Sequence, residues 1–552
     1  MSKINIFALG GLNEVGKNMY VVKVDEEIYI FDAGMKFNVE NAYGVDYILP
    51  DYNYLKENIN KINGIFISHA HKTHMGAVVD ILKEIPKIKI YGSNLTIEIL
   101  KEELQLNDMN YKKYSLNKLV AHKNVDFKNT SIFPISVTHS IPDSFMYVLY
   151  TPDGAIVYSG DLVFDMSKKG KYKTDLGKLA YVGKKGVLCL MNESYYAKNS
   201  GYTAPRNNSY EYINEVFSKT HNRIITTINI DHIYRLQEII DAVEQNHKKL
   251  IIMGSKLQRR INKLIELKYL EVNVEIGGLN NLNDKNIVVL VSDDNEQAFT
   301  NLDRIVKGFD KFLKLNNEDI VFISEPDTVG LERKKAIIMD EIAKQVDDVI
   351  SMDKNHLLFH SSKEDIRMLI NLMNPKFYMP IRGEYKDQVA NADIASSEGI
   401  PTKNIILKEN GDVVEIKDAK LQKTKEKIKV DEILIDGHFS DDVGELVLKD
   451  RESLGNNGIV LITVTLDKHT KEVLSDVEIV TRGFIYVKDN KELMDYTKEV
   501  TLKAIENNIK EKDGKKQVDY NAVKNEIRET LGKYYYKETE MRPLVISVVQ
   551  EV

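Results

Sequence analysis

The chain has 552 residues, 43% of them hydrophobic and 29% charged, which excludes a single hydrophobic core and predicts two to four domains. Its single cysteine, Cys189, excludes an internal disulfide, and no run approaches the roughly 18 apolar residues of a membrane-spanning helix; we therefore expect a cytoplasmic protein without membrane contact. The formal net charge of −7 neither supports nor excludes RNA as a partner, because basic residues that contact phosphate can be gathered locally.

The first 194 residues are predicted to form short β-strands separated by turns. Eight runs are rich in Val, Ile, Tyr and Phe, and glycines such as Gly34 and Gly160 punctuate them. The first run is too short, and too soon followed by Gly10 and Gly11, to be a signal peptide. The strands are expected at residues 4–9, 18–24, 27–34, 64–68, 131–139, 146–151, 155–161 and 187–194.

Three histidines, His69, His71 and His74, lie within six positions directly after the predicted strand 64–68. Residues 75–85 carry apolar side chains at helical spacing, so the histidines are expected on a strand-to-helix loop. Imidazoles clustered in this way are typical of a metal site. The residue before the last histidine is Thr73, where a carboxylate would complete such a cluster.

Three further strand ends carry a residue able to bind a metal, namely His139, Asp161 and Glu193. Ligands at the ends of strands from one sheet can converge above its edge, and imidazole with carboxylate suits zinc or manganese. Each of these residues alone is more simply an ordinary loop residue. The ordered set is what favours a metal centre.

The remaining sequence predicts two further folding units. From about residue 207 to 351 helices alternate with apolar strands, which is typical of an α/β unit with a largely parallel sheet. A charged stretch low in aromatic residues, 415–432, is predicted to be a linker, and the last hundred residues to form a small α+β domain. Helices are expected at 233–246, 256–270, 363–374 and 491–509, and strands at 223–228, 250–254, 286–292, 319–324, 376–384, 458–467, 476–487 and 542–552.

Motifs along essentially the whole chain resemble the bacterial ribonuclease J family, and within it a paralogue with a degenerate active site. They include "ALGGLNEVGKNMYVV", "SHAHKTHMGA", "VTHSIPDS", "SGDLVFD", "NPKFYMPIRGEY", "TRGFIYV" and "RPLVISVVQEV". The resemblance implies an α/β fold, a metallo-β-lactamase αββα sandwich with an inserted β-CASP α/β domain and a small C-terminal α+β domain. The implied ranges are 1–206 and 363–415 for the sandwich, 207–362 for β-CASP, 416–450 for a linker and 451–552 for the C-terminal domain.

Carried over from the family, one metal would be bound by His69, His71, His139 and Asp161. Asp161 would also bridge to a second ion, and His74 would be a ligand of that ion.

The second metal site departs from the family pattern at two positions. Thr73 stands where the family has aspartate, and Arg382 stands where it has histidine. A guanidinium does not deprotonate to bind a cation, and its repulsion of a divalent ion at 4 Å is on the order of 8 kcal/mol at an effective dielectric near 20. We therefore expect at most one divalent metal per chain, zinc or manganese, and an empty second site. Arg382 then either pairs with Asp161 or Glu193 or faces solvent.

The family's phosphate-binding loop, His-x-Ser-Gly-His-x-Ser, reads HLLFHSS here. Leu358 and Phe359 replace the serine and the glycine, which removes a hydroxyl donor and close backbone approach to a phosphate. Phe359 either stacks on a base or is buried as packing. By resemblance the catalytic residues would be His74, Glu193 and His360, and the substrate-binding residues His356, His360, Ser361 and Ser362.

Three functions remain open from the sequence. The favoured one is a ribonuclease J-type protein of weak or no activity that binds single-stranded RNA and assembles as a homodimer or with an active ribonuclease J paralogue. The second is a fully functional metal-dependent ribonuclease for messenger and ribosomal RNA. The third is a small-molecule hydrolase of the same superfamily, against which the long insertion between Glu193 and His356 counts, since a small substrate needs no such clamp.

Overall fold

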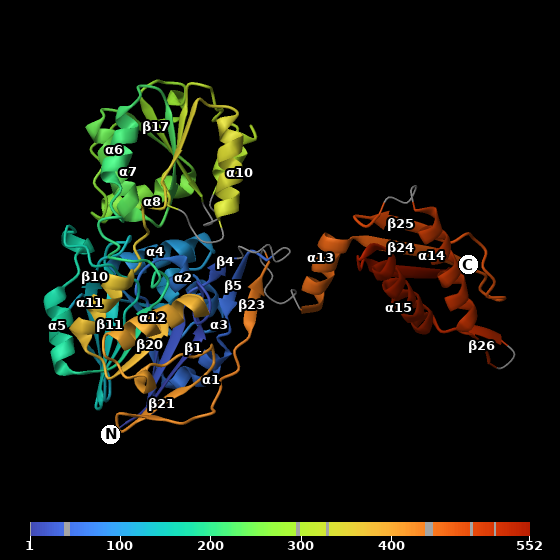
Figure 1. The fold of residues 1–552 in the computed structure, drawn as a ribbon, viewed down its shortest axis with the longest axis horizontal. Helices are drawn as coiled ribbons and strands as arrows, with labels where there is room; N and C mark the ends of the chain where they lie inside the picture. The colour runs from blue at the N-terminus through green and yellow to red at the C-terminus, as the bar shows by residue number, and fades with distance from the viewer. Residues whose placement is uncertain are drawn as a thin grey trace. The chain divides into compact units, whose positions relative to one another are not determined.

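The computed structural model describes residues 2–37, 45–293, 299–326, 331–436, 445–485, 490–512 and 515–552. The chain divides into two compact units, Met1–Val39 with Tyr47–Ile433, and Glu40–Asp46 with Leu434–Val552 (Figure 1). Among the described residues, no helix has both the length and the apolar content to cross a bilayer.

The first unit contains a sandwich of two sheets. The eight-stranded sheet has the order β22-β21-β1-β2-β3-β6-β7-β8, and the six-stranded sheet has the order β20-β13-β12-β11-β10-β9. Helix α4 packs on β7 and β8, whereas α5, α11 and α12 pack on the strands of the second sheet, so the predicted αββα sandwich is confirmed.

The bounds of these elements are as follows. The first sheet consists of β1 (Lys3–Gly10), β2 (Met19–Val24), β3 (Glu27–Phe31), β6 (Ile62–Phe66), β7 (Lys89–Gly92), β8 (Ser115–Lys118), β21 (Val414–Lys417) and β22 (Lys420–Gln422). The second consists of β9 (Val125–Asp126), β10 (Ser131–Val137), β11 (Ser144–Thr151), β12 (Gly154–Tyr158), β13 (Val187–Glu193) and β20 (Phe377–Ile381). The helices are α1 (Asn53–Asn58), α2 (Lys72–Met75), α3 (Val78–Glu84), α4 (Asn94–Leu106), α5 (Leu176–Lys185), α11 (Lys363–Met373) and α12 (Tyr385–Ser397), and β4 (Lys36–Phe37) pairs with β5 (Tyr47–Pro50).

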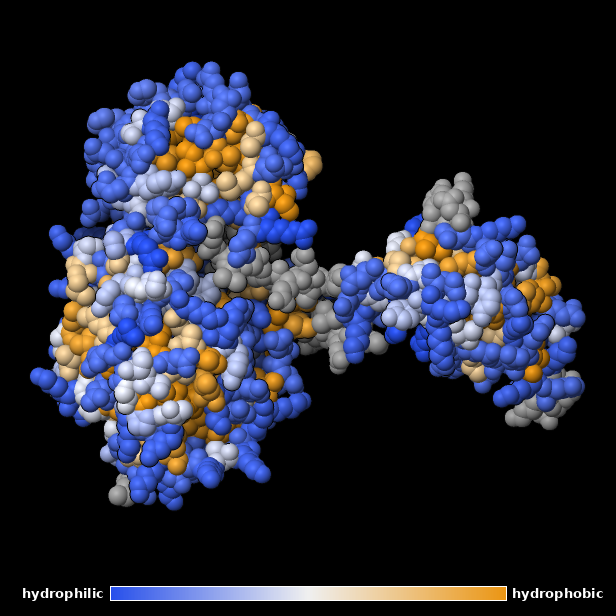
Figure 2. All heavy atoms as spheres, viewed as in Figure 1, coloured by the Kyte–Doolittle hydropathy of each residue, from blue (hydrophilic) through white to orange (hydrophobic). Residues whose placement is uncertain are grey.

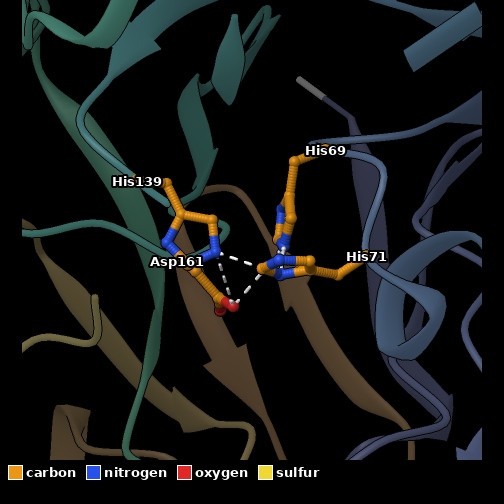
Figure 3. A group of neighbouring side chains, drawn as sticks. All are labelled: His69, His71, His139 and Asp161. Carbon is orange, nitrogen blue, oxygen red and sulfur yellow. Dashed lines mark hydrogen bonds and ion pairs between the residues drawn. The ribbon is translucent and has the colours of Figure 1, made fainter. Parts of the chain in front are cut away.

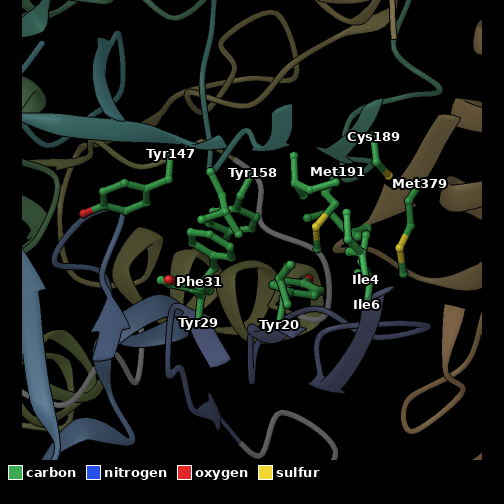
Figure 4. Packing of buried hydrophobic residues seen from close by; sticks show 14 of the residues in the cluster. Ile4, Ile6, Tyr20, Tyr29, Phe31, Tyr147, Tyr158, Cys189, Met191 and Met379 are labelled. Carbon is green, nitrogen blue, oxygen red and sulfur yellow. The ribbon is translucent and has the colours of Figure 1, made fainter. Parts of the chain in front are cut away.

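Aromatic side chains fill the space between the two sheets. Phe31 of the first sheet stacks on Tyr147 and Tyr158 of the second, with ring centroids 5.9 and 5.4 Å apart (Figure 4). All three side chains are at most 1% exposed, and burying a ring of this size contributes about 1.5–3 kcal/mol. This packing fixes the two sheets against each other and so fixes the strand ends that carry the candidate ligands.

The inserted α/β region is a six-stranded sheet of order β16-β15-β17-β14-β18-β19, in which every described pairing is parallel. Helices lie on both sides of it (Figure 1), as a parallel sheet with crossover helices requires. The predicted α/β unit is therefore confirmed. Its strands are β14 (Ile224–Asn229), β15 (Lys249–Met253), β16 (Ile276–Gly277), β17 (Ile287–Asp293), β18 (Ile320–Ile323) and β19 (Asp348–Ser351), and its helices α6 (Tyr210–Ser218), α7 (Ile233–Gln245), α8 (Ser255–Glu266), α9 (Thr300–Val306) and α10 (Glu332–Ala343).

The linker predicted at 416–450 is wrong at its beginning. Strand β21 pairs with β1 and turns back into β22, so these residues extend the first sheet of the sandwich. The reason is that Val414 and Ile416 alternate with charged residues and bury against the core, which the high local charge conceals. Residues 437–444 of the predicted linker lie outside the described residues.

The second unit is a small α+β fold, as predicted. Its sheet has the order β25-β24-β28, and the inward side chains of β24, such as Val460 and Ile462, form a core with helices α14 and α15. Residues 486 and 487 of the strand predicted at 476–487 lie outside the described residues. The elements from the end of the first unit onward are β23 (Glu432–Ile435), α13 (Glu445–Asn457), β24 (Ile459–Leu466), β25 (Glu478–Arg482), α14 (Lys491–Asn507), β26 (Ile509–Lys512), β27 (Lys515–Val518), α15 (Tyr520–Thr539) and β28 (Leu544–Glu551).

Candidate metal centre

The side chains predicted to bind metal come from the ends of strands in both sheets. In the second sheet β12, β13 and β20 are parallel neighbours, so their carboxyl ends meet at one edge. Residues that follow these strands must therefore lie close together. His69 and His71 follow β6, His139 follows β10, Asp161 follows β12, Glu193 ends β13 and Arg382 follows β20.

Four of these side chains surround a common point (Figure 3). His71 Nδ1 lies 3.0 Å from His69 Nε2 and 3.2 Å from His139 Nε2. Asp161 Oδ2 lies 3.6 Å from His69 Nε2 and 3.8 Å from His139 Nε2. Ligand atoms bound tetrahedrally at zinc distances would be about 3.4 Å apart, so these four residues fit one such ion.

Hydrogen bonds on the far side of the rings orient two of the histidines. His139 Nδ1 donates to the backbone carbonyl of Phe359 at 2.9 Å, which leaves the Nε2 lone pair facing the other ligands. His69 Nδ1 lies 2.9 Å from Ser68 Oγ. Burial lowers the pKa of His69 and His139 well below the usual value and that of His71 to about 3. The neutral imidazole is the form that binds metal.

His74 lies beside this group but makes different contacts. Its Nδ1 lies 2.6 Å from Asp32 Oδ2, and its Nε2 lies 3.2 Å from Asp161 Oδ2. Burial opposes charge on this ring, but Asp161 and Asp32 together raise the pKa of His74 to about 9. His74 is thus held as a donor between two carboxylates.

Asp32 is a residue that the sequence analysis did not single out. Its carboxylate accepts hydrogen bonds from the backbone N–H of Ser68 at 2.6 Å and from the Ser68 hydroxyl at 2.8 Å, and it also contacts Tyr158 and His74. It therefore fixes the start of the histidine loop. The available signal was a carboxylate in the last part of the predicted strand 27–34, directly before Ala33 and Gly34.

Arg382 lies inside the centre, which excludes the alternative that it faces solvent. The residue is 5% exposed, and its Nη1 pairs with Asp161 Oδ1 and lies 3.2 Å from Glu193 Oε2 and 3.0 Å from His360 Nδ1. Burial works against the charge of Asp161, but the guanidinium of Arg382 and the ring of His74 hold the pKa of that carboxyl well below its usual range.

The residues at the position of the second metal do not fit a divalent ion. Asp161, Glu193 and His360 lie close enough to share a metal, but Arg382 already contacts all three. Thr73 offers a hydroxyl in place of a carboxylate, and its backbone carbonyl accepts from Asn18 N at 3.2 Å and Asn18 Nδ2 at 3.0 Å. A second divalent ion would require Arg382 to leave.

The loop that resembles a phosphate-binding loop is occupied by structural contacts. The Ser361 hydroxyl donates to the carbonyl of Leu162 at 2.6 Å. The hydroxyl of Ser362, the residue directly before α11, lies 2.7 Å from the hydroxyl of Thr203. Both serines are at most 1% exposed. Binding of substrate by either hydroxyl would first require one of these contacts to break.

The other residues of this loop diverge in position. His360 Nδ1 lies 3.1 Å from Glu193 Oε2, within the centre, whereas His356 contacts Asp353 and the ring of Tyr212 instead. Phe359 was predicted either to stack on a base or to be buried. The residue is 1% exposed, so its ring is buried in the protein. Leu358 is half-buried, and its backbone N–H bonds to the Tyr196 hydroxyl.

Two tyrosines that directly follow Glu193 also went unnoticed in the sequence. The rings of Tyr195 and Tyr196 stack at 5.0 Å, and His360 meets them edge-on at 4.9 and 5.4 Å. They pack against His360 and so help to bury the Arg382 half of the centre. Their position next to a strand-end carboxylate was the only signal in the sequence.

Comparison with known proteins finds three family models that match successive parts of the chain. They are the metallo-beta-lactamase superfamily at residues 12–180, the ribonuclease J beta-CASP domain at 221–342 and the ribonuclease J C-terminal domain at 446–552. Proteins named ribonuclease J 2 from Staphylococcus epidermidis and Staphylococcus aureus are each 31% identical, over 100% of this chain and 98% of theirs. A solved structure described as a protein of unknown function from Enterococcus faecalis V583 has a TM-score of 0.52 at 17% identity, covers 75% of this chain and 100% of its own, and supports the fold alone.

Proposed function

Since this chain belongs to the ribonuclease J family, we propose that it is an RNA-processing protein of that family with weak or no nuclease activity of its own, working in the cytoplasm as partner subunit of an active ribonuclease J. The observation that carries the proposal is the buried guanidinium of Arg382, paired with Asp161 and Glu193. Asp161 is the carboxylate that would bridge the two ions, and Glu193 belongs to the group that could hold the second one. The chain therefore keeps the fold of a nuclease and half of its metal centre.

The first half of the centre fits one zinc or manganese ion, which would be held by His69, His71, His139 and Asp161. When bound, such an ion polarises a water or a phosphoryl oxygen, whereas two-metal nucleases stabilise both the attacking and the leaving oxygen. His360 is the remaining candidate for proton transfer, but its Nδ1 is engaged by Glu193 and Arg382. One ion and an engaged histidine support slow hydrolysis at most.

Restoring the family's ligands tests this proposal. The double substitution Thr73→Asp with Arg382→His is expected to raise manganese- or zinc-dependent hydrolysis of 5′-monophosphorylated RNA at least about tenfold. The reason is that it replaces a hydroxyl and a cation by two metal ligands. Elemental analysis should find at most one ion per wild-type chain and two per double mutant. Brisk hydrolysis by a wild-type chain with two ions would instead establish a fully functional ribonuclease.

The partner role is supported by the outward face of the C-terminal sheet. Leu461 lies opposite Val480 on one side and Ile546 on the other, and Val480 and Ile546 are 42% and 39% exposed. Figure 2 shows hydrophobic residues near β24 and β25 in this unit. We assign this apolar row to a ribonuclease J subunit, since assembly buries such patches. Val480→Lys with Ile546→Lys should abolish co-elution with an active ribonuclease J and leave the melting temperature unchanged; unchanged co-elution would overturn the assignment.

Binding to single-stranded RNA is tested by its salt dependence. Phosphate contacts release counterions, so the affinity for RNA should fall steeply as salt rises. A neutral small molecule, the substrate of a related hydrolase, would hardly respond. An affinity for RNA that salt leaves unchanged would count against RNA as the ligand.

A further inference from the structure

The β-CASP domain packs on the sandwich through a buried arginine. Arg260 on α8 is 1% exposed, and its guanidinium contacts three carboxylates. Its Nη1 lies 2.8 Å from Asp231 of the same domain, whereas its Nε lies 2.9 Å from Glu102 and its Nη2 3.4 Å from Glu103, both on α4 of the sandwich. Figure 1 shows α8 next to α4.

Among the described residues Glu102 pairs with Arg260 alone, whereas Glu103 has a second cationic partner. Its Oε1 faces Arg260, and its Oε2 lies 2.5 Å from Nζ of Lys72. In the described part of the chain Lys72 pairs with Glu103 and not with Glu102. The two adjacent glutamates therefore share the arginine, but only Glu103 connects it to another residue.

Lys72 belongs to the loop that carries the metal ligands. It lies directly after His71, and its carbonyl accepts hydrogen bonds from Met35 N at 2.9 Å and Gly76 N at 2.8 Å. The carbonyl of His71 accepts in turn from the amides of His74 and Met75. Because these bonds tie Lys72 to the short helix α2, a displacement of Lys72 also displaces His71.

We propose that Glu103 is a positioning residue that couples the docking of the β-CASP domain to the geometry of the metal loop. Glu103 is 6% exposed, in a contact between α4 and α8. With α8 in place the carboxylate is held between two cations in a poorly hydrated environment, where ion pairs are strong. If α8 moves away, Glu102 and Glu103 are left side by side, water reaches them, and the pair with Lys72 becomes an exposed one of little strength.

The coupling is reciprocal, because any device that links two sites acts in both directions. Docking of the β-CASP domain then orders His71, and an ion bound at His71 favours docking. The claim that a bound ion favours docking rests on the proposed function, since it assumes that the first half of the centre binds a metal. The claim that docking orders His71 does not depend on a bound metal.

Amide hydrogen exchange of the metal-free protein tests the coupling directly. The conservative variant Arg260→Lys, made in the β-CASP domain, is expected to speed exchange at the amides of His74, Met75 and Gly76 by roughly three- to tenfold, the size that such networks transmit. The matched control is Arg259→Lys on the exposed side of the same helix, which should leave those amides unchanged.

Two glutamate backgrounds decide whether Glu103 carries the effect. The effect of Arg260→Lys should persist with Glu102→Gln and disappear with Glu103→Gln, because only Glu103 reaches Lys72. The proposal would be overturned if Arg260→Lys sped amide exchange equally in both backgrounds, as a general loss of packing would, or if it had no effect in the wild type.

A metal arm separates this proposal from the function on which it partly rests. Competition with a chelator should show that Arg260→Lys weakens Zn²⁺ and Mn²⁺ binding about tenfold in the wild type and with Glu102→Gln, but not with Glu103→Gln. A wild-type chain that binds neither ion would overturn the proposed metal centre. The exchange result would still decide the coupling.

Discussion

The two halves of the candidate centre share Asp161 but have opposite electrostatics. In the first half three imidazoles, held neutral by lowered pKa values, and one carboxylate lie close enough to one another to share a divalent ion. In the second half the carboxylates Asp161 and Glu193 are still present, but Arg382 pairs with both. The comparison teaches that a cation placed between two carboxylates can occupy the position of a metal ion.

The largest expected effect comes from removing that cation. Arg382→Ala removes the cation that pairs with Asp161 and Glu193 and leaves both buried carboxylates without it. This should lower the free energy of unfolding by about 3–5 kcal/mol. Thermal unfolding in the presence of a chelator measures this without an ion taking the vacated place. The control is Arg259→Ala, at an exposed position of the same unit. An unchanged melting temperature would mean that Arg382 does not neutralise this half.

Alanine at one histidine in each half should sharpen the contrast. His139→Ala removes a ligand and is expected to weaken Zn²⁺ binding more than about 100-fold, because loss of an outer partner alone already costs 10–100-fold. His360→Ala should leave the affinity within about twofold. Isothermal titration with Zn²⁺ measures both. Equal losses would show that the ion lies between the halves rather than within the first.

A smaller effect is expected from serines that flank each half. Ser68→Ala removes a contact to His69 and to Asp32, so Zn²⁺ affinity should fall about tenfold. Ser361→Ala removes a buried hydrogen bond to Leu162 and should lower stability by about 1 kcal/mol without changing metal affinity. Metal titration and chemical denaturation of both variants distinguish the roles, and a metal effect at Ser361 would contradict this division.

The smallest effect concerns the ring of Phe359. The ring contacts His139 of the sandwich and Tyr234 of the β-CASP domain and is buried. Phe359→Leu should therefore lower the free energy of unfolding by less than about 1.5 kcal/mol and leave the affinity for single-stranded RNA unchanged. Fluorescence anisotropy with a labelled RNA measures the affinity. A clear loss of RNA binding would show that the ring turns outward and stacks on a base.

Much of the fold could be predicted because its signals are local. Alternation of apolar side chains marks the strands of the sandwich, and the helical spacing after His74 marks α3. The signal failed at β21 and β22, where lysines and glutamates surround two buried residues. The short strand β21 gains its stability from pairing with β1, and that pairing is not visible in its own sequence.

Within the centre the sequence identified the residues but not their contacts. His69, His71, His139 and Asp161 were expected together, and the structure brings them within reach of one ion. Asp32, Tyr195 and Tyr196 were missed, since each lies beside a recognised motif without belonging to a metal-ligand pattern.

The sequence by itself determined which chemical groups are present: three closely spaced histidines, and a hydroxyl and a guanidinium at Thr73 and Arg382 where a second ion would need ligands. Only the tertiary structure decided that Arg382 turns inward onto Asp161, and that Ser361 and Ser362 are engaged elsewhere. The physical reason is that the charge and donor type of a side chain are fixed by its residue. Its partners depend on strand ends that lie hundreds of residues apart and meet only when the two sheets pack.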